Sequence, residues 1–156
     1  QLAFYTGARL EELCQLKRND VTTEDGIPSL YIREAKTKAG VRVVPIHPCL
    51  KTLIKKLAKD SNDDYLITEQ NNDAHGKRSN ALGKRFNRLK VKLGFGGDKV
   101  FHSIRKTVIT ILENHRIPEG VSADIVGHEK KTMTYGLYSG GSGAKLKFDA
   151  IKKIRL

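Results

Sequence analysis

The residues in this sequence that could do chemistry are mainly cationic, and one tyrosine stands among them. His102 and Arg105 are three residues apart in FHSIRKT, a spacing that aims both side chains from one face of a helix. His128 follows Gly127 in VGH, and Tyr138 directly precedes the flexible run SGGSG. Glycines build packed pockets poorly, so a tyrosine in this setting fits a group that moves to a substrate better than a core residue.

Cleavage of a phosphodiester bond is a reaction that such a set could perform. Negative charge grows on the non-bridging oxygens as a nucleophile reaches phosphorus, and the planar fork of arginine meets that charge with two hydrogen bonds. A tyrosine nucleophile must lose a proton, which its ordinary pKa of about 10 makes unfavourable outside a strongly positive site. Two further cations fit this requirement: Arg9, at a predicted helix start after Thr6-Gly7, and Lys38, near a predicted hairpin tip.

Each of these residues also has an ordinary structural explanation. An arginine after Thr-Gly is usually a surface cation, a Gly-His pair commonly ends a helix, and a lone tyrosine is more often a packed ring. Lysines at hairpin tips are usually only solvated. The argument for a site therefore depends on the combination.

The overall charge favours a polyanionic partner. The chain has 156 residues, a length that suits a single domain, and a formal net charge of +12 with 38% hydrophobic residues. No apolar run is long enough to cross a bilayer, and no lysine-rich amphipathic segment carries membrane-seeking aromatics. We therefore expect nucleic acid, not membrane, as the partner.

The cysteines and the first residues give two weaker expectations. Cys14 and Cys49 lack the spacing of a zinc site, and Cys14 shares an apolar helical stripe with Leu10 and Leu13. A buried, reduced Cys14 is expected, which favours a cytoplasmic setting. The chain starts with QLAFY, which reads as a helix already under way, so we expect a fragment of a longer protein.

Hydrophobic periodicity predicts a mainly helical α+β fold with a small antiparallel β-sheet. A helix is expected over residues 9–17, followed by a β-hairpin in LYIREAKTKAGVRVVPI with its turn near residues 38–40. The next predicted helix carries Leu50, Leu53, Ile54 and Leu57 on one face, and YLIT reads as a short strand.

Four more helices are predicted in the second half of the chain. The helix over residues 79–93 has the apolar stripe Leu82, Phe86, Leu89 and Leu93, with basic residues on its other faces. FHSIRKTVITILENH is the next, with an inward stripe that includes Val108. PEGVSADIVG reads as a short helix that ends at Gly127, and AKLKFDAIKKI as a final amphipathic helix.

Taken in chain order, the motifs resemble those of the tyrosine recombinases, specifically the catalytic domain of phage-type integrases. TGARLEEL looks like the family's first arginine box, TKAGVRVVPI like its hairpin lysine, FHSIRKT like its His-x-x-Arg box, VGH like its Gly-His element and YGLYSGG like its nucleophile segment. The resemblance implies this set of catalytic residues: Arg9, Lys38, His102, Arg105, His128 and Tyr138.

Two assignments have close alternatives. Lys36 competes with Lys38, which we favour because it follows Thr37 and precedes a small Ala-Gly turn. Tyr135 competes with Tyr138, which we favour because the family's tyrosine usually lies nine or ten residues beyond the Gly-His histidine. The resemblance also gives Glu12 the place of a supporting acid that holds the basic side chains.

The resemblance implies a division of labour within the site. Tyr138 would attack the scissile phosphate and form a 3′-phosphotyrosyl link, Arg9 and Arg105 would clamp the non-bridging oxygens, and Lys38 would protonate the departing 5′ oxygen. No cofactor or metal would be needed, because cationic side chains supply the charge. Consistent with this, the sequence shows no clear carboxylate cluster for two metal ions.

The histidines and the rest of the chain complete the expectation. His102 would assist proton transfer at the tyrosine, and His128 would donate a hydrogen bond to the phosphate. Residues 1–156 would be one catalytic domain without the family's N-terminal core-binding domain. The substrate would be double-stranded DNA at attachment sites, in the nucleoid of a bacterial host.

The resemblance further implies a homotetramer on DNA for the full-length protein, with the tail after Tyr138 docking on a neighbouring protomer, while the fragment itself could be monomeric. Two alternatives from other classes are a non-catalytic DNA-binding module of the same fold and a type IB topoisomerase-like enzyme.

Overall fold

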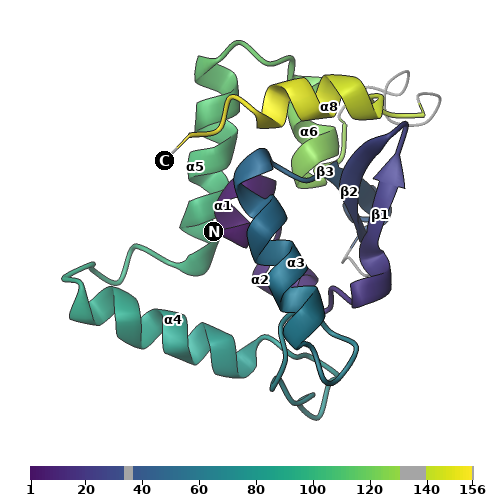
Figure 1. Ribbon diagram of the computed structural model, residues 1–156. Helices are drawn as coiled ribbons and strands as arrows, with labels where there is room; N and C mark the ends of the chain where they lie inside the picture. Colours follow the sequence, from purple (N-terminus) through teal and green to yellow (C-terminus); the bar gives the residue numbers. More distant parts are fainter. Residues whose placement is uncertain (34–36, 131–139, 156) are drawn as a thin grey trace.

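A computed structural model of the chain describes residues 1–33, 37–130 and 140–155. It places helices around a three-stranded antiparallel sheet of order β1-β2-β3 (Figure 1). The α+β class with a mainly helical architecture is therefore confirmed. Among the described helices, none is long and apolar enough to cross a membrane.

The sheet consists of β1 (Val21–Glu24), β2 (Ile27–Ile32) and β3 (Arg42–Pro45). Asp25 and Gly26, with φ of 50° and 75°, form the two-residue turn between β1 and β2 that suits the twist of a hairpin. Leu30 of β2 lies opposite Val44 of β3, and both are buried. The predicted β2–β3 hairpin is thus present, and a 3₁₀ turn, η2 (Lys38–Gly40), precedes β3.

The helices around the sheet bury apolar residues, among them Val108 from the stripe predicted for residues 101–115. Val108 and Leu112 of one helix are fully buried, as are Ile125 of the next and Ile151 near the C-terminus. Together with Leu30 and Val44 they belong to one continuous core. The helices are α1 (Leu2–Thr6), α2 (Leu10–Cys14), α3 (Lys51–Asp60), α5 (Phe101–Asn114), α6 (Glu119–Val126) and α8 (Ala144–Ile151).

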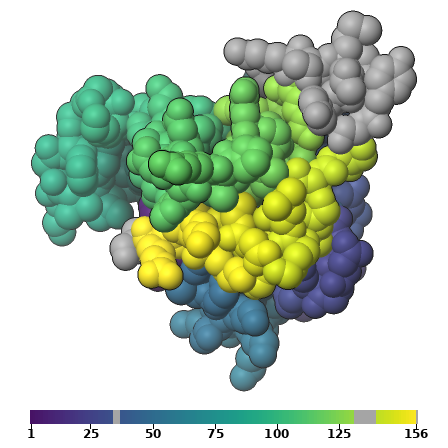
Figure 2. All heavy atoms as spheres, turned by 90° about the horizontal axis from the view of Figure 1, so that it is seen from above, coloured from purple at the N-terminus to yellow at the C-terminus, as the bar shows by residue number. Residues whose placement is uncertain are grey.

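The last helix, α8, packs on its own chain. It contacts α6, β3 and β2, and Figures 1 and 2 show it lying across one face of the molecule between the helices and the sheet. Ala144, Ala150 and Ile151 are buried there, and the Lys147 ammonium donates to the Val43 carbonyl at 2.8 Å. Residues 144–151 thus pack on their own chain, and docking of the tail on a neighbouring protomer of the full-length protein stays a prediction.

Two predicted elements differ from the observed ones. The helix expected over residues 9–17 ends at Cys14, because the chain turns extended at Lys17, whose N–H donates to the Asp20 carboxylate at 2.8 Å. The predicted strand in YLIT is only an isolated bridge between Lys17 and Tyr65. A left-handed Asp64, with φ of 66°, precedes Tyr65, and the chain bends at residues 66 and 67, so the extended run around the bridge is too short for a strand.

The helix α4 (Asn80–Lys92) has the predicted position but not the predicted burial. It contacts α5 and extends away from the rest of the molecule (Figure 1). Phe86 packs edge-on against Phe101, with ring centroids 5.1 Å apart, whereas Leu89 and Leu93 are 54% and 62% exposed. Lys90, one of the basic residues outside the apolar stripe, is buried because its ammonium donates to the Gly96 and Lys99 carbonyls.

Candidate active site

Arg105 joins the two loops that carry Arg9 and His128. Its side chain on α5 is 1% exposed, and Nη1 donates to the Gly7 carbonyl at 2.8 Å while Nη2 reaches the Gly127 carbonyl at 3.4 Å. Gly7 lies two residues before Arg9, and Gly127 directly precedes His128. The guanidinium thus brings together three motifs that are far apart in the sequence.

Both glycines at these junctions are required by the geometry. Gly7 ends α1 with φ of 62°, and a Cβ there would lie 2.8 Å from Val126 Cγ1. Gly127 ends α6 with φ of 74°, and a Cβ there would lie 2.6 Å from Arg42 Nη1. Any other residue would combine left-handed strain with a clash, so the Thr-Gly and Gly-His pairs serve close packing as well as turn formation.

Glu12 organises the other half of the site. Its Oε2 accepts from the Arg9 backbone N–H at 2.9 Å, which closes the first turn of α2, and its Oε1 pairs with Arg9 Nη1 at 2.6 Å. Arg42 Nη2 donates to Oε2 at 3.0 Å. Burial acts to raise the pKa of Glu12, but Arg42 and Arg9 outweigh it and hold that pKa below its usual value. Glu12 thus pairs with Arg9 and Arg42, and its role as the supporting acid stays a prediction.

Arg42 is a part of this site that the sequence reasoning missed. Besides Glu12, it donates from Nε to the Ile125 carbonyl at 2.7 Å and from Nη1 to the Gly40 carbonyl at 2.6 Å. The buried side chain thereby ties the end of α6 and the η2 turn to α2. A signal was present: a lone arginine within an apolar strand, VRVVP, has to find a buried partner.

The cluster carries more positive than negative charge. Arg9, Arg42 and Arg105 act electrostatically on one another, and Glu12 is the carboxylate that acts on Arg105 from among the described residues. Burial, followed by repulsion from Arg9 and Arg42, lowers the pKa of Arg105 to about 10. Three guanidinium groups around a single carboxylate leave a surplus that an anion would neutralise.

Both predicted histidines feel this positive charge. Partial burial of its ring lowers the pKa of His102, and the nearby charges of Arg105, Arg9 and Lys106 lower it further, although the residue as a whole is exposed. The pKa of His128 falls for the same reasons: burial first, then Arg105, Arg9 and His102. The two imidazoles therefore share one electrostatic site with both predicted arginines and are neutral at pH 7.

The remaining predicted residues are less closely defined. Lys38 begins the η2 turn and is exposed, two residues from the Gly40 carbonyl that accepts from Arg42. Lys36, Tyr135 and Tyr138 lie outside the described residues, so both open assignments stay predictions. Within the described part of the chain, His, Cys, Asp and Glu side chains form no group of three that could hold a metal ion.

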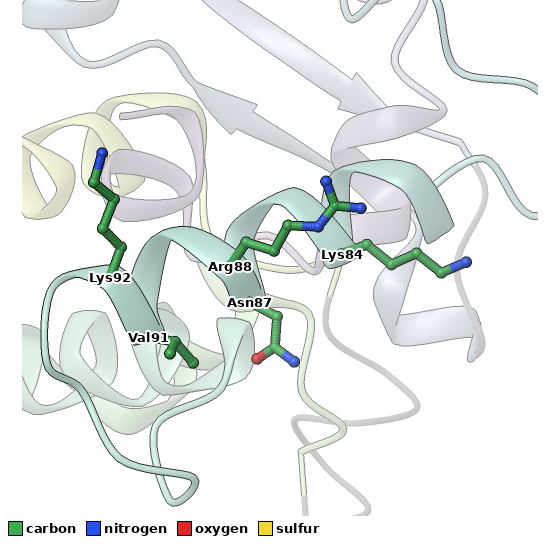
Figure 3. Close-up of a pocket in the computed structure, with 5 residues that line it drawn as sticks. All are labelled: Lys84, Asn87, Arg88, Val91 and Lys92. Carbon is green, nitrogen blue, oxygen red and sulfur yellow. The ribbon is translucent and has the colours of Figure 1, made fainter.

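A basic groove runs along the exposed side of α4. Lys84, Asn87, Arg88, Val91 and Lys92 line it, and Figure 3 shows all five side chains projecting from this one helix. Their spacing of three or four residues places them on one helical face. The groove thus offers cations in one row of this face, and an amide and a branched apolar group in the neighbouring row (Figure 3).

Comparison with known proteins identifies the family. Residues 1–141 match the phage integrase family. The prophage integrase IntF of Escherichia coli K12 is 27% identical over 140 residues, a match that covers 85% of this chain and 28% of IntF. The chain therefore spans under a third of the length of that curated relative.

Solved structures share the fold. XerH site-specific recombinase, in a post-cleavage complex with its palindromic difH substrate, aligns with a TM-score of 0.61 at 22% identity, covering 89% of this chain and 41% of XerH. The Tn1549 transposon integrase, bound to circular intermediate DNA, gives 0.61 at 23% identity, covering 95% and 57%. With the fold and the sequence match in agreement, this chain belongs to the phage integrase family.

Proposed function

We propose that this chain is the catalytic domain of a site-specific DNA recombinase that cuts and rejoins strands through a 3′-phosphotyrosyl intermediate. The observation that carries the proposal is the convergence of Arg9, Arg42 and Arg105 on a single carboxylate, Glu12, with both histidines beside them. A surplus of fixed positive charge is what a phosphodiester needs as it becomes more negative during attack.

The contacts of Arg105 leave its positive charge free to bind an anionic ligand. It is held in place by backbone carbonyls, which orient the guanidinium without neutralising its charge. Its Nε has no hydrogen-bond partner among the described residues, although the side chain is 1% exposed. A buried unpaired donor is costly, and a phosphate oxygen is an acceptor that would relieve the cost once the groups that cover the guanidinium move aside.

The proposed chemical steps use each group according to its charge state. Tyr138 attacks phosphorus, and its phenolic proton passes to His102, which is neutral at pH 7 and can accept it. Arg9 and Arg105 bind the non-bridging oxygens, and His128 donates a hydrogen bond to the same phosphate. A lysine of the β2–β3 connection, Lys38 in our assignment, protonates the departing 5′ oxygen.

The α4 groove supports double-stranded DNA as the substrate. Lys84, Arg88 and Lys92 present charge along one line of an exposed helix, which suits contacts to successive phosphates. Asn87 and Val91 lie between them, and an amide and a methyl-bearing side chain are groups that contact base edges. The groove thus extends the cationic surface beyond the catalytic cluster.

A nicked suicide substrate tests the proposal directly. Cleavage near the nick releases a short strand that cannot religate, so the wild-type chain should accumulate a covalent protein–DNA adduct. Tyr138→Phe should form none, and Tyr135→Phe should form it normally. An adduct that persists in Tyr138→Phe but disappears in Tyr135→Phe would move the nucleophile to Tyr135. DNA binding with no adduct in any variant would support the non-catalytic module instead.

Two further arms separate the remaining alternatives. Full activity in EDTA supports cationic side chains in place of a metal, whereas strict dependence on magnesium contradicts our proposal. Relaxation of supercoiled DNA without site preference would favour a topoisomerase-like enzyme. The variants Lys36→Ala and Lys38→Ala decide which lysine protonates the departing 5′ oxygen. A substrate with sulfur at the bridging 5′ position should restore cleavage only in the variant that lacks this lysine, because a thiolate leaves without a proton.

A further inference from the structure

Asp124, on α6, binds residues on both sides of the segment that contains Tyr138. Its carboxylate accepts from the Lys130 ammonium at 2.8 Å, from the Ser142 backbone N–H at 2.7 Å and from the Ser142 hydroxyl at 2.7 Å. Lys130 directly precedes residues 131–139, and Ser142 follows them by three residues. One side chain therefore holds the two described flanks together.

These contacts are sheltered from water. The side chains of Lys130 and Asp124 are 13% and 19% exposed, which reduces the screening that weakens surface ion pairs. Burial acts to raise the pKa of Asp124, but the hydrogen bonds from Lys130 and Ser142 outweigh it, so that pKa lies below its usual value. The carboxylate is thus ionised at neutral pH and accepts charge-assisted hydrogen bonds from both flanks.

The anchor at Ser142 limits where the tyrosine can go. Ser142 lies four positions after Tyr138, and four steps of fully extended chain reach about 14 Å at most. The Ser142 contact involves backbone N–H, so it fixes the main chain itself. Asp124 belongs to the same helix, α6, whose end carries the Gly127 carbonyl that binds Arg105. The anchor and one of the carbonyls that hold the cationic cluster therefore lie on the same helix.

We propose that Asp124 is a positioning residue that sets the reach of the nucleophile segment relative to the cationic cluster, by tying Lys130 and Ser142 to α6. The inference rests on the proposed function for its catalytic consequence, because Tyr138 is the nucleophile there. It adds a residue outside the family motifs, with a structural effect that can be measured without DNA.

Asp124→Asn is the test variant, because it keeps the shape of the side chain and removes its charge. Trypsin must take the extended Lys130 side chain into its specificity pocket, which requires release of the ion pair. We expect cleavage after Lys130, followed by mass spectrometry, to accelerate about tenfold, the effect of losing one hydrogen bond to a charged group. Asp149→Asn is the matched control, because Asp149 also pairs with two lysines, Lys145 and Lys152, but outside this segment.

The catalytic consequence is measured as the single-turnover rate of covalent adduct formation on the nicked substrate. Asp124→Asn should slow it about tenfold while the Kd for DNA changes less than about twofold, and Asp149→Asn should change neither. Ser142→Ala keeps the backbone N–H contact and should give a smaller loss of rate. A positioning role predicts this graded loss with unchanged affinity, whereas a merely structural role would lower affinity and rate together.

Unchanged trypsin cleavage in Asp124→Asn would overturn the anchoring itself, and an unchanged adduct rate would overturn its catalytic role. A fall in the rate that is matched by a fall in DNA affinity or in the unfolding midpoint would also count against positioning. If the wild-type chain forms no adduct, the proposed function fails, but the trypsin comparison still decides whether Asp124 holds the two flanks.

Discussion

Replacing Gly127 by alanine should be far more damaging than replacing a glycine of the same conformation elsewhere. Gly127 has φ of 74°, and Gly76 has φ of 73°. Left-handed backbone costs a non-glycine residue about 1 kcal/mol, so both variants should lose at least that much stability. Around Gly76 nothing lies within 4 Å of an added Cβ, which makes Gly76→Ala a measure of backbone strain alone.

At Gly127 the added methyl group also displaces Arg42. The Cβ would lie 2.6 Å from Arg42 Nη1 and 2.9 Å from Cζ. The guanidinium cannot simply move aside, because it donates to Ile125, Gly40 and Glu12. Loss of one hydrogen bond to this buried cation adds about 2 kcal/mol, so Gly127→Ala should cost about 3 kcal/mol against about 1 kcal/mol for Gly76→Ala.

Urea unfolding of the two variants, with equal m-values, gives the comparison directly. Gly127→Ala should also slow adduct formation on the nicked substrate, because Gly127 and Arg42 both contact groups that orient the cluster, while Gly76→Ala should leave it unchanged. Equal losses of stability in the two variants would refute the reasoning, since they would mean that Arg42 yields at no cost and does not fix the site.

Three further predictions follow from the charges of the site. Glu12→Gln should destabilise the chain by about 3 kcal/mol at pH 7, because Arg42 stays buried without its counter-charge. In urea unfolding, the difference between wild type and variant should shrink as pH falls below about 4 and then through the lowered pKa of Glu12, because the wild-type carboxylate becomes protonated. NMR titration should place the pKa of His102 and of His128 below 6.5, and DNA should raise both by adding negative charge. In the absence of DNA, the unfolded chain binds a proton at these histidines more tightly than the folded chain does. Both histidines should therefore lower the free energy of unfolding as pH falls below about 6.5. Arg88→Ala on α4 should lower the slope of log affinity against log salt by about 1, whereas Lys145→Ala on α8 should not.

Much of the fold follows from local pattern. The stripe that contains Val108 gave a helix whose buried face includes that residue, and Gly127 ends α6 as its type indicates. These features depend on neighbours within a few residues, which a single sequence contains. The spacing of His102 and Arg105 belongs to the same class, because one helical turn fixes it.

The features that the sequence pattern did not predict depend on partners that are far away in the sequence. Arg42 pairs with Glu12, thirty positions earlier, and with the Ile125 carbonyl on another helix, so its role emerges only when β3, α2 and α6 meet. The stripe of α4 has a helical period at Leu89 and Leu93, but periodicity does not say whether another element covers it. The burial of Lys90 likewise depends on carbonyls of the following loop.

The way the cluster is held explains why it can keep its charge. A guanidinium anchored by carboxylates would be neutralised, and a phosphate would then have to compete with those acids. Arg105 is anchored by the Gly7 and Gly127 carbonyls instead, and Arg42 takes two of its three partners from backbone carbonyls. Carbonyls orient the groups as firmly while leaving their charge for the substrate. At Gly127 the absence of a Cβ also leaves the room that Arg42 occupies, because a Cβ there would lie 2.6 Å from Arg42 Nη1. The glycine of the Gly-His motif is therefore as much a part of the electrostatics as the arginine that it accommodates, whereas Gly7 makes room for the apolar side chains of Val126 and Val108.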